Sequence, residues 1–440
     1  MTTNPRGDDS PEPPASEVPD GNGLARALGR RVGRGAIVEG LTLLSGGASK
    51  ETWSFDAVVP EGARTELVLR RDSTGRASEP GAVHREAAAI TQAHAAGLPV
   101  PELFFITDVP GIGPAGMIMR RVSGQTIARK ILRDEQYAAA RPVLVGQLGR
   151  FAAGLHALAV PDAFPEPDPL AQLREQLDTF GLAPSSQHSE VFELALDWLS
   201  AHQPPPRDPV LLHGDFRLGN LIIGPEGLRA VLDWELTHAG NPAEDLGWLC
   251  VKAWRFGAAP AVAGLGSRED LLAAYRSAGG ADISLDELRW WEVLGTLRWG
   301  VICLTQAFAH LSGAHRSVEL AAIGRRVCEQ EWDLLLLLDP DSARRAAANR
   351  PRPTGAGQAS PAPFGRPTVS ELIEAVREYL LTAVLPGTQG QVAFHARVAA
   401  NALAIVAREL ELGSVPPDGD LAAQVAARLS VANPRYFGAP

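Results

Sequence analysis

Cysteine is scarce in this chain of 440 residues. The three cysteines, Cys250, Cys303 and Cys328, lie far apart, and none belongs to a C-x-x-C pair. This distribution predicts neither a disulfide framework nor a zinc site, and each cysteine is interpreted as a small core residue. The chain also lacks an uninterrupted run of about 18 apolar residues and a basic, apolar leader, so no membrane span or signal peptide is expected. We therefore expect a cytoplasmic protein.

Acidic residues outnumber basic residues. The sequence has 51 aspartates and glutamates against 41 lysines and arginines, a formal net charge of −10 at pH 7. This balance disfavours a nucleic-acid partner and mildly favours a cationic or neutral substrate. The length, with 45% hydrophobic residues, is sufficient for two or three compact units with buried cores.

The most informative segment runs from His213 to Asn220 and has the sequence HGDFRLGN. It places an acid, Asp215, five residues before the amide of Asn220. This D-x-x-x-x-N spacing is typical of a kinase catalytic loop, in which the aspartate accepts the proton of the substrate hydroxyl and the asparagine holds Mg²⁺. The segment therefore predicts Asp215 as a catalytic base and Asn220 as a metal ligand.

A short hairpin follows this loop and supplies a second carboxylate. Residues 221–223 are typical of a buried strand, residues 224–227 of a turn, and residues 228–232 of the returning strand. Because the two arms have similar length, we expect Asp233 to return beside Asn220. One carboxylate, one amide oxygen and the phosphates of a nucleotide are sufficient ligands for Mg²⁺, which prefers hard oxygen atoms.

A purely structural interpretation of these residues is also open. Asp and Asn favour turns and strand ends, so Asp215 and Asn220 could cap turns and Asp233 could end a strand. A lone D-x-x-x-x-N spacing would favour that interpretation. Here the loop, the apolar hairpin, the sequence DWE at 233–235 and the sequence GNPAEDL at 240–246 occur in order. Their combination favours the catalytic roles.

Hydrophobic patterning divides the chain into five segments. Residues 1–24 are polar and rich in proline, which predicts a disordered N-terminus. Five short strands and a helix in residues 25–122 predict a small first lobe, and helical periodicity in residues 123–338 predicts a mainly helical second lobe. Residues 339–366 have almost no large apolar side chains and are expected to form a flexible linker. A capping-box sequence then opens a small helical domain at residues 367–440.

The catalytic segment, the GNPAEDL continuation and the SGGAS turn at 45–49 together resemble the aminoglycoside phosphotransferase family of small-molecule kinases. The resemblance covers residues 36–338. Within the family, the chain is similar to the branch that includes the kinase portion of acyl-CoA dehydrogenase family members 10 and 11. It implies an α+β, bilobal protein-kinase-like fold with a small five-stranded N-lobe and a mainly helical C-lobe. The stretch from Pro367 onward, with AFHARVAANAL at 393–403, resembles a small helical domain appended to bacterial members of this branch.

The resemblance implies that the glycine-containing turn covers the phosphates of ATP. The residues expected to contribute are Ser45, Gly46, Gly47 and Ser49. Glycine lacks a Cβ, so backbone N–H groups can approach a phosphate closely at such a turn. A plain Gly-Gly hairpin turn is the structural alternative.

A basic residue and a helix glutamate form the second expected part of the nucleotide site. Kinases of the general pattern have a lysine at the end of the third strand, whereas this chain has Arg70 there, with Glu86 as the matching acid. An arginine stays cationic and can grip phosphate and carboxylate in a forked geometry. Strand alternation sends Arg70 and Arg71 to opposite faces, and Arg70 is the favoured one. An exposed helix glutamate remains the alternative for Glu86.

Four further polar residues lie in or near these motifs, and His156 lies apart from them. Arg217 is expected either to offset charge on the transferring phosphoryl group or to pair with an acid such as Glu235. Glu235 is equally consistent with a contact to metal or acceptor and with a supporting hydrogen bond. His213 is expected to brace the loop, and Asp245, at the start of a helix, is interpreted as a scaffold residue. His156 has no motif around it and is interpreted as a packed core histidine.

Together these patterns predict an ATP-dependent small-molecule kinase that uses Mg²⁺ and acts on a hydroxylated substrate. The resemblance implies a hydroxyacyl-CoA or related metabolite as the first acceptor class and an aminoglycoside or other hydroxylated amine as the second. A pseudokinase is the alternative of a different kind: a nucleotide-binding scaffold whose C-terminal helical domain binds a protein partner. The arginine at position 70 keeps this alternative open, whereas the retained Asp215, Asn220 and Asp233 argue against it.

Overall fold

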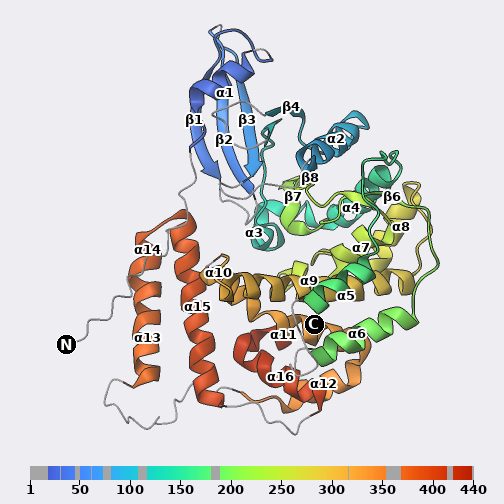
Figure 1. The fold of residues 1–440 in the computed structure, drawn as a ribbon, viewed down its shortest axis with the longest axis vertical. Coiled ribbons are helices and arrows are strands. Elements are labelled where there is room, and N and C mark those ends of the chain that lie inside the picture. Colours follow the sequence, from blue (N-terminus) through green and yellow to red (C-terminus); the bar gives the residue numbers. More distant parts are fainter. Residues whose placement is uncertain are drawn as a thin grey trace. The chain divides into compact units, whose positions relative to one another are not determined.

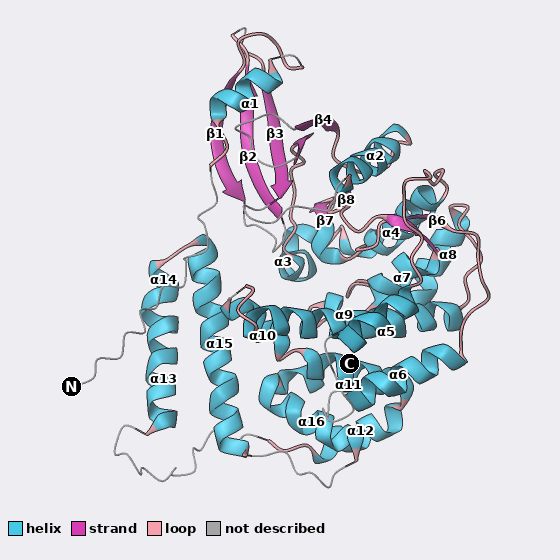
Figure 2. Ribbon diagram, viewed as in Figure 1, coloured by secondary structure: helices cyan, strands magenta, loops and turns pink. Residues whose placement is uncertain are grey.

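Contacts within the chain define two compact units in the computed structural model. The first unit contains residues 1–124 and 229–237, and the second contains residues 125–228 and 238–440. The structure describes residues 18–29, 31–44, 50–60, 62–72, 81–107, 116–179, 189–315, 317–352, 368–413 and 420–438. Most of the helices and strands are labelled in Figure 1, and Figure 2 colours them by type.

A five-stranded antiparallel sheet forms the centre of the first unit. Its strand order is β1-β2-β3-β5-β4, and each neighbouring pair is antiparallel. The elements of this unit are α1 (Gly21–Leu28), β1 (Ile37–Leu44), β2 (Lys50–Val58), β3 (Arg64–Asp72), α2 (Ala82–Ala95), β4 (Leu103–Thr107) and β5 (Gly116–Arg120). The five strands expected from the sequence are confirmed.

Helix α1 begins within the stretch that was expected to be disordered. The carboxylate of Asp20 caps it by accepting hydrogen bonds from backbone N–H groups of the first turn. Leu24 and Leu28, one helical turn apart, are fully buried among apolar residues of β2 and β3. The prediction of disorder is wrong for residues 21–24, because an N-cap followed by apolar residues at helical spacing stabilises a helix here.

The second unit is mainly helical, as expected. Short strands and helical turns interrupt its helices. Its helices are α3 (Ala128–Arg133), α4 (Arg141–His156), α5 (Pro169–Thr179), α6 (Ser189–Ala201), α7 (Ala243–Cys250), α8 (Arg268–Ser277), α9 (Leu285–Leu311), α10 (Val318–Gly324), α11 (Val327–Leu338), α12 (Pro340–Asn349), α13 (Val369–Tyr379), α14 (Leu385–Gly387), α15 (Gly390–Leu412) and α16 (Leu421–Ala432). The helical turns are η1 (Glu135–Tyr137), η2 (Leu218–Asn220), η3 (Lys252–Arg255), η4 (Leu380–Val384) and η5 (Pro434–Gly438).

The short strands form two separate pairs. Strand β6 (Val210–Leu212) pairs with β9 (His238–Gly240), and β7 (Leu221–Gly224) pairs with β8 (Gly227–Val231). The second pair is the hairpin expected from the sequence, and it follows η2 directly. All three cysteines of the chain are buried, in agreement with their interpretation as core residues. None of the helices in the described ranges is long and apolar enough to cross a membrane.

The start of the expected linker is a helix. Helix α12 is capped by Asp339, begins with Pro340, and buries Ala343 and Ala346. The prediction of a linker is therefore wrong for this stretch, because alanine favours a helix and needs little space at a packed interface. Residues 353–366 of the expected linker lie outside the described residues.

The C-terminal helices contact other helices of the second unit. The capping box predicted at Thr368 and Glu371 is present and opens α13, which lies beside α15 (Figure 1). Helix α15 contacts α10, and α16 contacts both α11 and α12. These contacts connect the C-terminal helices to α10, α11 and α12.

Two glycines of α4 provide a matched test of the packing between α4 and α8. A Cβ added at Gly149 would lie 2.8 Å from Ala274 Cβ and 2.9 Å from the backbone nitrogen of Tyr275. A Cβ at Gly146 would meet only the flexible end of Arg150, at 3.3 Å. We expect Gly149→Ala to lower the free energy of unfolding by about 1–3 kcal/mol, because overpacking separates the helices.

The control, Gly146→Ala, should raise the free energy of unfolding by about 0.5–1 kcal/mol through helix propensity. Urea denaturation followed by circular dichroism measures both variants. Equal losses of stability in the two variants would contradict the close approach of α4 and α8.

Candidate active site

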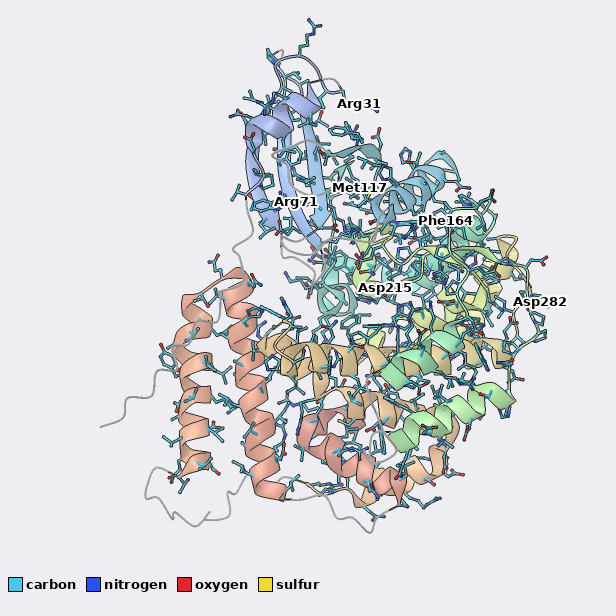
Figure 3. All side chains as sticks on the ribbon, viewed as in Figure 1. Arg31, Arg71, Met117, Phe164, Asp215 and Asp282 are labelled. Atoms are coloured by element: carbon cyan, nitrogen blue, oxygen red, sulfur yellow. The ribbon has the colours of Figure 1, made fainter. Side chains whose placement is uncertain are left out.

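The loop with the D-x-x-x-x-N spacing connects β6 to η2 in the second unit. Strand β6 pairs with β9 in antiparallel register, from Val210 opposite Gly240 to Leu212 opposite His238. Strand β9 leads into α7, so the pairing places the start of α7 beside the loop. Asp215, labelled in Figure 3, lies in this loop.

Three side chains donate hydrogen bonds to the carboxylate of Asp215. Arg217 Nε lies 2.9 Å from Oδ1 and 3.1 Å from Oδ2. Trp248 Nε1 lies 2.7 Å from Oδ1, and Asn220 Nδ2 lies 2.7 Å from Oδ2. The Asp215 side chain is 14% exposed. Because both oxygens accept hydrogen bonds from side chains of the loop, η2 and α7, the carboxylate is held in one orientation.

The same contacts orient the amide of Asn220. Its Nδ2 also donates to the backbone oxygen of Asp215, at 3.0 Å. Both of these contacts use the amide nitrogen, so neither of them occupies the amide oxygen. An amide oxygen is a hard ligand of the kind that Mg²⁺ accepts. The orientation of Asn220 therefore fits the role of a magnesium ligand.

Arg217 contacts the expected base itself. Besides donating to Asp215, its guanidinium group lies 4.8 Å from the ring centroid of Trp254 in η3. The sequence offered an acid such as Glu235 as the partner of Arg217, and the acid that it contacts here is Asp215. A guanidinium group over an indole ring is stabilised by a cation–π interaction, so Trp254 helps to place Arg217.

A buried carboxylate holds the backbone of the loop. Asp245, in the first turn of α7, accepts hydrogen bonds from the backbone N–H groups of His213 at 2.8 Å and Gly214 at 2.9 Å. His156 Nε2 lies 3.3 Å from Asp245, and His156 Nδ1 lies 2.9 Å from the hydroxyl of Tyr275. Burial alone would raise the pKa of Asp245, but His156 and His213 outweigh it and hold this pKa below its ordinary value.

Sequence reasoning identified part of this network. His156 is buried, as interpreted, but it contacts Asp245 and Tyr275 from more than 80 positions away. Trp248 was missed altogether, although it lies two residues after the end of the GNPAEDL sequence. The only sequence signal for Trp248 is its position three residues after Asp245, which places both on one side of α7.

Arg70 forms ion pairs with three carboxylates in the first unit. Its Nη1 contacts Glu86, its Nη2 contacts Asp233, and Nη2 also lies 3.4 Å from Glu235 Oε2. Burial lowers the pKa of Arg70, yet these three carboxylates raise it above its ordinary value overall. Burial also raises the pKa of Glu86, against the opposing charges of Arg70 and Lys50.

Lys50 is a second cation at Glu86 that sequence reasoning missed. Its Nζ lies 3.7 Å from Glu86 Oε2 and 3.2 Å from Asp72 Oδ1, and the residue is buried. In the register of β2 and β3, Thr52 lies opposite Arg70. Because side chains alternate along a strand, Lys50 shares the sheet face of Arg70. Counting back two positions from the residue opposite Arg70 would have found it.

Arg71 has a different environment from Arg70. Its Nη2 lies 3.0 Å from Glu51 Oε2, and its guanidinium group lies 5.9 Å from the ring of Trp53. Arg71 is labelled in Figure 3. The two arginines therefore contact separate sets of residues, as strand alternation predicts.

Asp233 has an unusual backbone conformation. Its φ is +67°, one of three positive values among the non-glycine residues that the structure describes. The following residue, Trp234, is buried and donates from Nε1 to the backbone oxygen of Val231 at 3.1 Å. Such conformations cost free energy and cluster at functional sites.

The predicted phosphate turn, with Ser45, Gly46, Gly47 and Ser49, lies outside the described residues.

Family models match two parts of the chain. The model described as "Phosphotransferase enzyme family" (APH) matches residues 40–282. A second model, described as "Domain of unknown function (DUF6285)", matches residues 386–419. The first match covers more than half of the chain and contains the two clusters around Asp215 and Arg70.

Curated relatives are similar to part of the chain. Acyl-CoA dehydrogenase family member 11 of Gallus gallus is 35% identical over 167 residues, which cover 35% of this chain and 21% of that protein. Family member 11 of Pongo abelii is 27% identical over 239 residues, which cover 50% of this chain and 30% of that protein. The chain thus spans less than a third of the length of these relatives.

A solved structure shares the fold. Spectinomycin phosphotransferase APH(9)-Ia, in complex with ADP and spectinomycin, aligns with a TM-score of 0.52 over 73% of this chain and 99% of that chain, at 14% identity. The sheet of the first unit and the helices of the second therefore form a kinase-like fold, and the C-terminal helices are additional to it.

Replacing the carboxylate of Asp245 tests its role in holding the loop. In Asp245→Asn an amide N–H₂ group faces backbone N–H donors, so we expect the free energy of unfolding at pH 7 to fall by about 3 kcal/mol. The stabilising contribution of Asp245 is present above the ordinary aspartate pKa of about 3.9 and is lost as the pH falls through its lowered pKa. The difference between wild type and variant should therefore shrink toward acid pH.

The matched control is Asp420→Asn. Asp420 also accepts a hydrogen bond from a backbone N–H group, that of Ala423, but it is exposed at the start of α16. Asparagine is an equally good N-cap, so this variant should stay within about 0.5 kcal/mol of wild type. Thermal and urea denaturation between pH 3 and pH 7 measure both. A difference for Asp245→Asn that is small and independent of pH would refute the assignment.

Proposed function

Because the chain belongs to the phosphotransferase enzyme family, we propose that it is an ATP-dependent small-molecule kinase that transfers the γ-phosphoryl group to an acceptor hydroxyl. The observation that carries this proposal is the held carboxylate of Asp215, which accepts hydrogen bonds from Arg217, Asn220 and Trp248. A carboxylate fixed in this way can orient an acceptor hydroxyl, and positioning provides much of the rate in phosphoryl transfer.

The proposed reaction is a direct transfer. The acceptor oxygen forms a bond to the γ-phosphorus of ATP as the bond from that phosphorus to the β,γ-bridging oxygen breaks, which releases ADP. The proton of the acceptor hydroxyl passes to Asp215. Arg217, which contacts the same carboxylate, is proposed to offset negative charge on the transferring group.

Asn220 and Asp233 are the proposed magnesium ligands. The cation would neutralise charge on the nucleotide phosphates when bound. The chemistry of the donors fits, because Asn220 supplies an amide oxygen, while its nitrogen contacts Asp215, and Asp233 supplies a carboxylate. Asp233 is also one of the three carboxylates that Arg70 contacts, so a proposed metal ligand and a proposed phosphate-binding cation are neighbours in the first unit.

Arg70, Glu86 and Lys50 form the proposed grip on the nucleotide phosphates. Glu86 contacts Arg70 through Oε1 and lies near Lys50 through Oε2, so one buried carboxylate fixes two cations. The turn with Ser45, Gly46, Gly47 and Ser49 is proposed to cover the phosphates. Two cations at this place make the arginine at position 70 compatible with nucleotide binding and weaken the pseudokinase alternative.

The first acceptor class that we propose is a hydroxylated acyl thioester or related metabolite. Its support is the similarity to acyl-CoA dehydrogenase family members, which covers only a part of those proteins. Hydroxylated amines such as aminoglycosides form the second class. A panel of hydroxyacyl-CoAs, free hydroxy acids, aminoglycosides and amino alcohols, tested with ATP and GTP in the presence and absence of Mg²⁺, distinguishes them. Nucleotide binding without transfer to any acceptor would favour the scaffold alternative.

Asp215→Asn should abolish most of the transfer. Loss of the proton acceptor is expected to lower kcat by about 10²- to 10⁴-fold, while the dissociation constant for ATP stays within about threefold because Asp215 contacts the acceptor rather than the nucleotide. Coupled detection of ADP and calorimetric titration with ATP measure the two quantities. The control is Asp282→Asn, since that side chain is 81% exposed and is labelled in Figure 3. Undiminished turnover in Asp215→Asn would refute its role as the base.

Arg70→Gln should weaken nucleotide binding. It removes a cation that contacts Glu86 and Asp233, and the loss of charge-assisted hydrogen bonds to phosphate is expected to raise the dissociation constant for ATP by about 10- to 100-fold. Calorimetry in the Asp215→Asn background measures binding without turnover. The control is Arg120→Gln, because Arg120 is half exposed and forms a surface ion pair with Glu102. Equal effects of the two substitutions would remove Arg70 from the nucleotide site.

A further inference from the structure

Helix α11 carries three buried carboxylates at alternate positions. Glu329 is 4% exposed, Glu331 is 0% exposed and Asp333 is 2% exposed. None of them belongs to the clusters around Asp215 and Arg70. A buried carboxylate is costly unless a hydrogen-bond donor or a cation compensates it. The partners of these three residues therefore indicate which parts of the chain α11 requires.

One partner of each carboxylate comes from the end of the chain. We call residues 421–438, which comprise α16 and η5, the C-terminal segment. Its three contacts with α11 are Asn433 Nδ2 to Glu329 Oε1 at 3.1 Å, Arg428 Nη2 to Glu331 Oε2 at 2.7 Å, and Tyr436 Oη to Asp333 Oδ2 at 2.7 Å. Phe437 adds an edge contact to the ring of Trp332, with centroids 5.0 Å apart. The C-terminal segment is therefore built into the core around α11.

Asp333 links this segment to η3. Its second oxygen, Oδ1, accepts a hydrogen bond from Lys252 Nζ at 3.0 Å. The same Nζ lies 4.3 Å from the ring centroid of Tyr436. Lys252 is thus held between a carboxylate and an aromatic ring, and Tyr436 contacts both partners. Burial of its hydroxyl group raises the pKa of Tyr436, so the hydroxyl keeps its proton and can donate to Asp333.

The helical turn η3, which Lys252 opens, reaches the catalytic loop two residues later. Trp254 lies under the guanidinium group of Arg217, and its ring centroid is 5.3 Å from that of Trp248. Arg217 and Trp248 both donate to Asp215. A continuous set of contacts therefore runs from Tyr436 through Asp333, Lys252 and η3 to two of the three donors that orient Asp215.

We propose that Tyr436 is a positioning residue for phosphoryl transfer, through which the C-terminal segment holds η3 and thereby the donors of Asp215. The inference rests on the proposed role of Asp215. It assigns the C-terminal segment a part in catalysis rather than in scaffolding alone. A residue with this role affects turnover more than the binding of nucleotide, because its contacts lead to the base and not to Arg70.

Tyr436→Phe is the first test, because it removes only the hydroxyl group that donates to Asp333. We expect kcat to fall by about three- to thirtyfold, while the KM for ATP changes by less than about twofold. Tyr379→Phe is the matched control: the same substitution in α13, at a tyrosine that is 62% exposed, should leave kcat unchanged. An unchanged kcat in a folded Tyr436→Phe protein would overturn the proposal.

Lys252→Met tests the other contact of Asp333, the one with η3. It removes the cation at Asp333 and leaves the hydrogen bond from Tyr436 in place. If both residues act through Asp333, combining Lys252→Met with Tyr436→Phe should lower kcat by less than the product of the two single fold-losses. Independent, multiplicative effects would contradict a shared path. This variant also serves if Tyr436→Phe alone does not fold.

Hydrogen exchange provides a measurement that does not depend on transfer activity. In Tyr436→Phe, amides of residues 213–220 and 252–255 should exchange faster than in wild type, whereas those of the sheet in the first unit should not change. Faster exchange confined to α16 and η5 would reduce Tyr436 to a local stabilising residue and overturn the proposal. Failure of the proposed function appears instead as absence of transfer by wild type, with the exchange pattern intact.

Discussion

The buried carboxylate of Asp245 is the constraint on which the geometry around Asp215 depends. It accepts the backbone N–H groups of His213 and Gly214, and it is itself held by His156. A carboxylate inside a protein is tolerated only when its hydrogen bonds are made, so the loop and α7 must adopt a matching arrangement. Trp248 lies on the same helix, three residues after Asp245. Because the spacing of the two residues along α7 is fixed, anchoring Asp245 at the loop also places the indole N–H of Trp248 at Asp215.

Local patterns were sufficient to predict much of the fold. The five strands, the hairpin after Asn220 and the capping box at Thr368 each depend on residues within a few positions of one another, and all are present. The errors at residues 21–24 and at α12 have a common origin, because each is a short helix stabilised by burial against residues far away in the sequence. The composition of such a segment shows only that its residues are polar or small. It does not show which distant residues pack against the segment in the folded chain.

In the candidate site, too, contacts between residues far apart in the sequence could not be predicted. Spacing within one loop identified Asp215 and Asn220, and strand alternation separated Arg70 from Arg71. Spacing could not show that His156 and Tyr275 support the loop, nor that Lys50 lies near Glu86, because these contacts follow from helix packing and sheet register. The roles of the site residues in transfer remain predictions, whereas their mutual contacts are structural observations.

The contacts between α11 and the end of the chain bear on where this protein can be cut. The family match ends at residue 282, yet Glu331 and Asp333 have partners at Arg428 and Tyr436. A fragment that ends at residue 282 would lack both Asp333 and Tyr436, so Lys252 at the start of η3 would lose its carboxylate and its aromatic partner. The contacts that hold η3 therefore extend beyond the phosphotransferase family match, to Asp333 and to Tyr436 near the end of the chain.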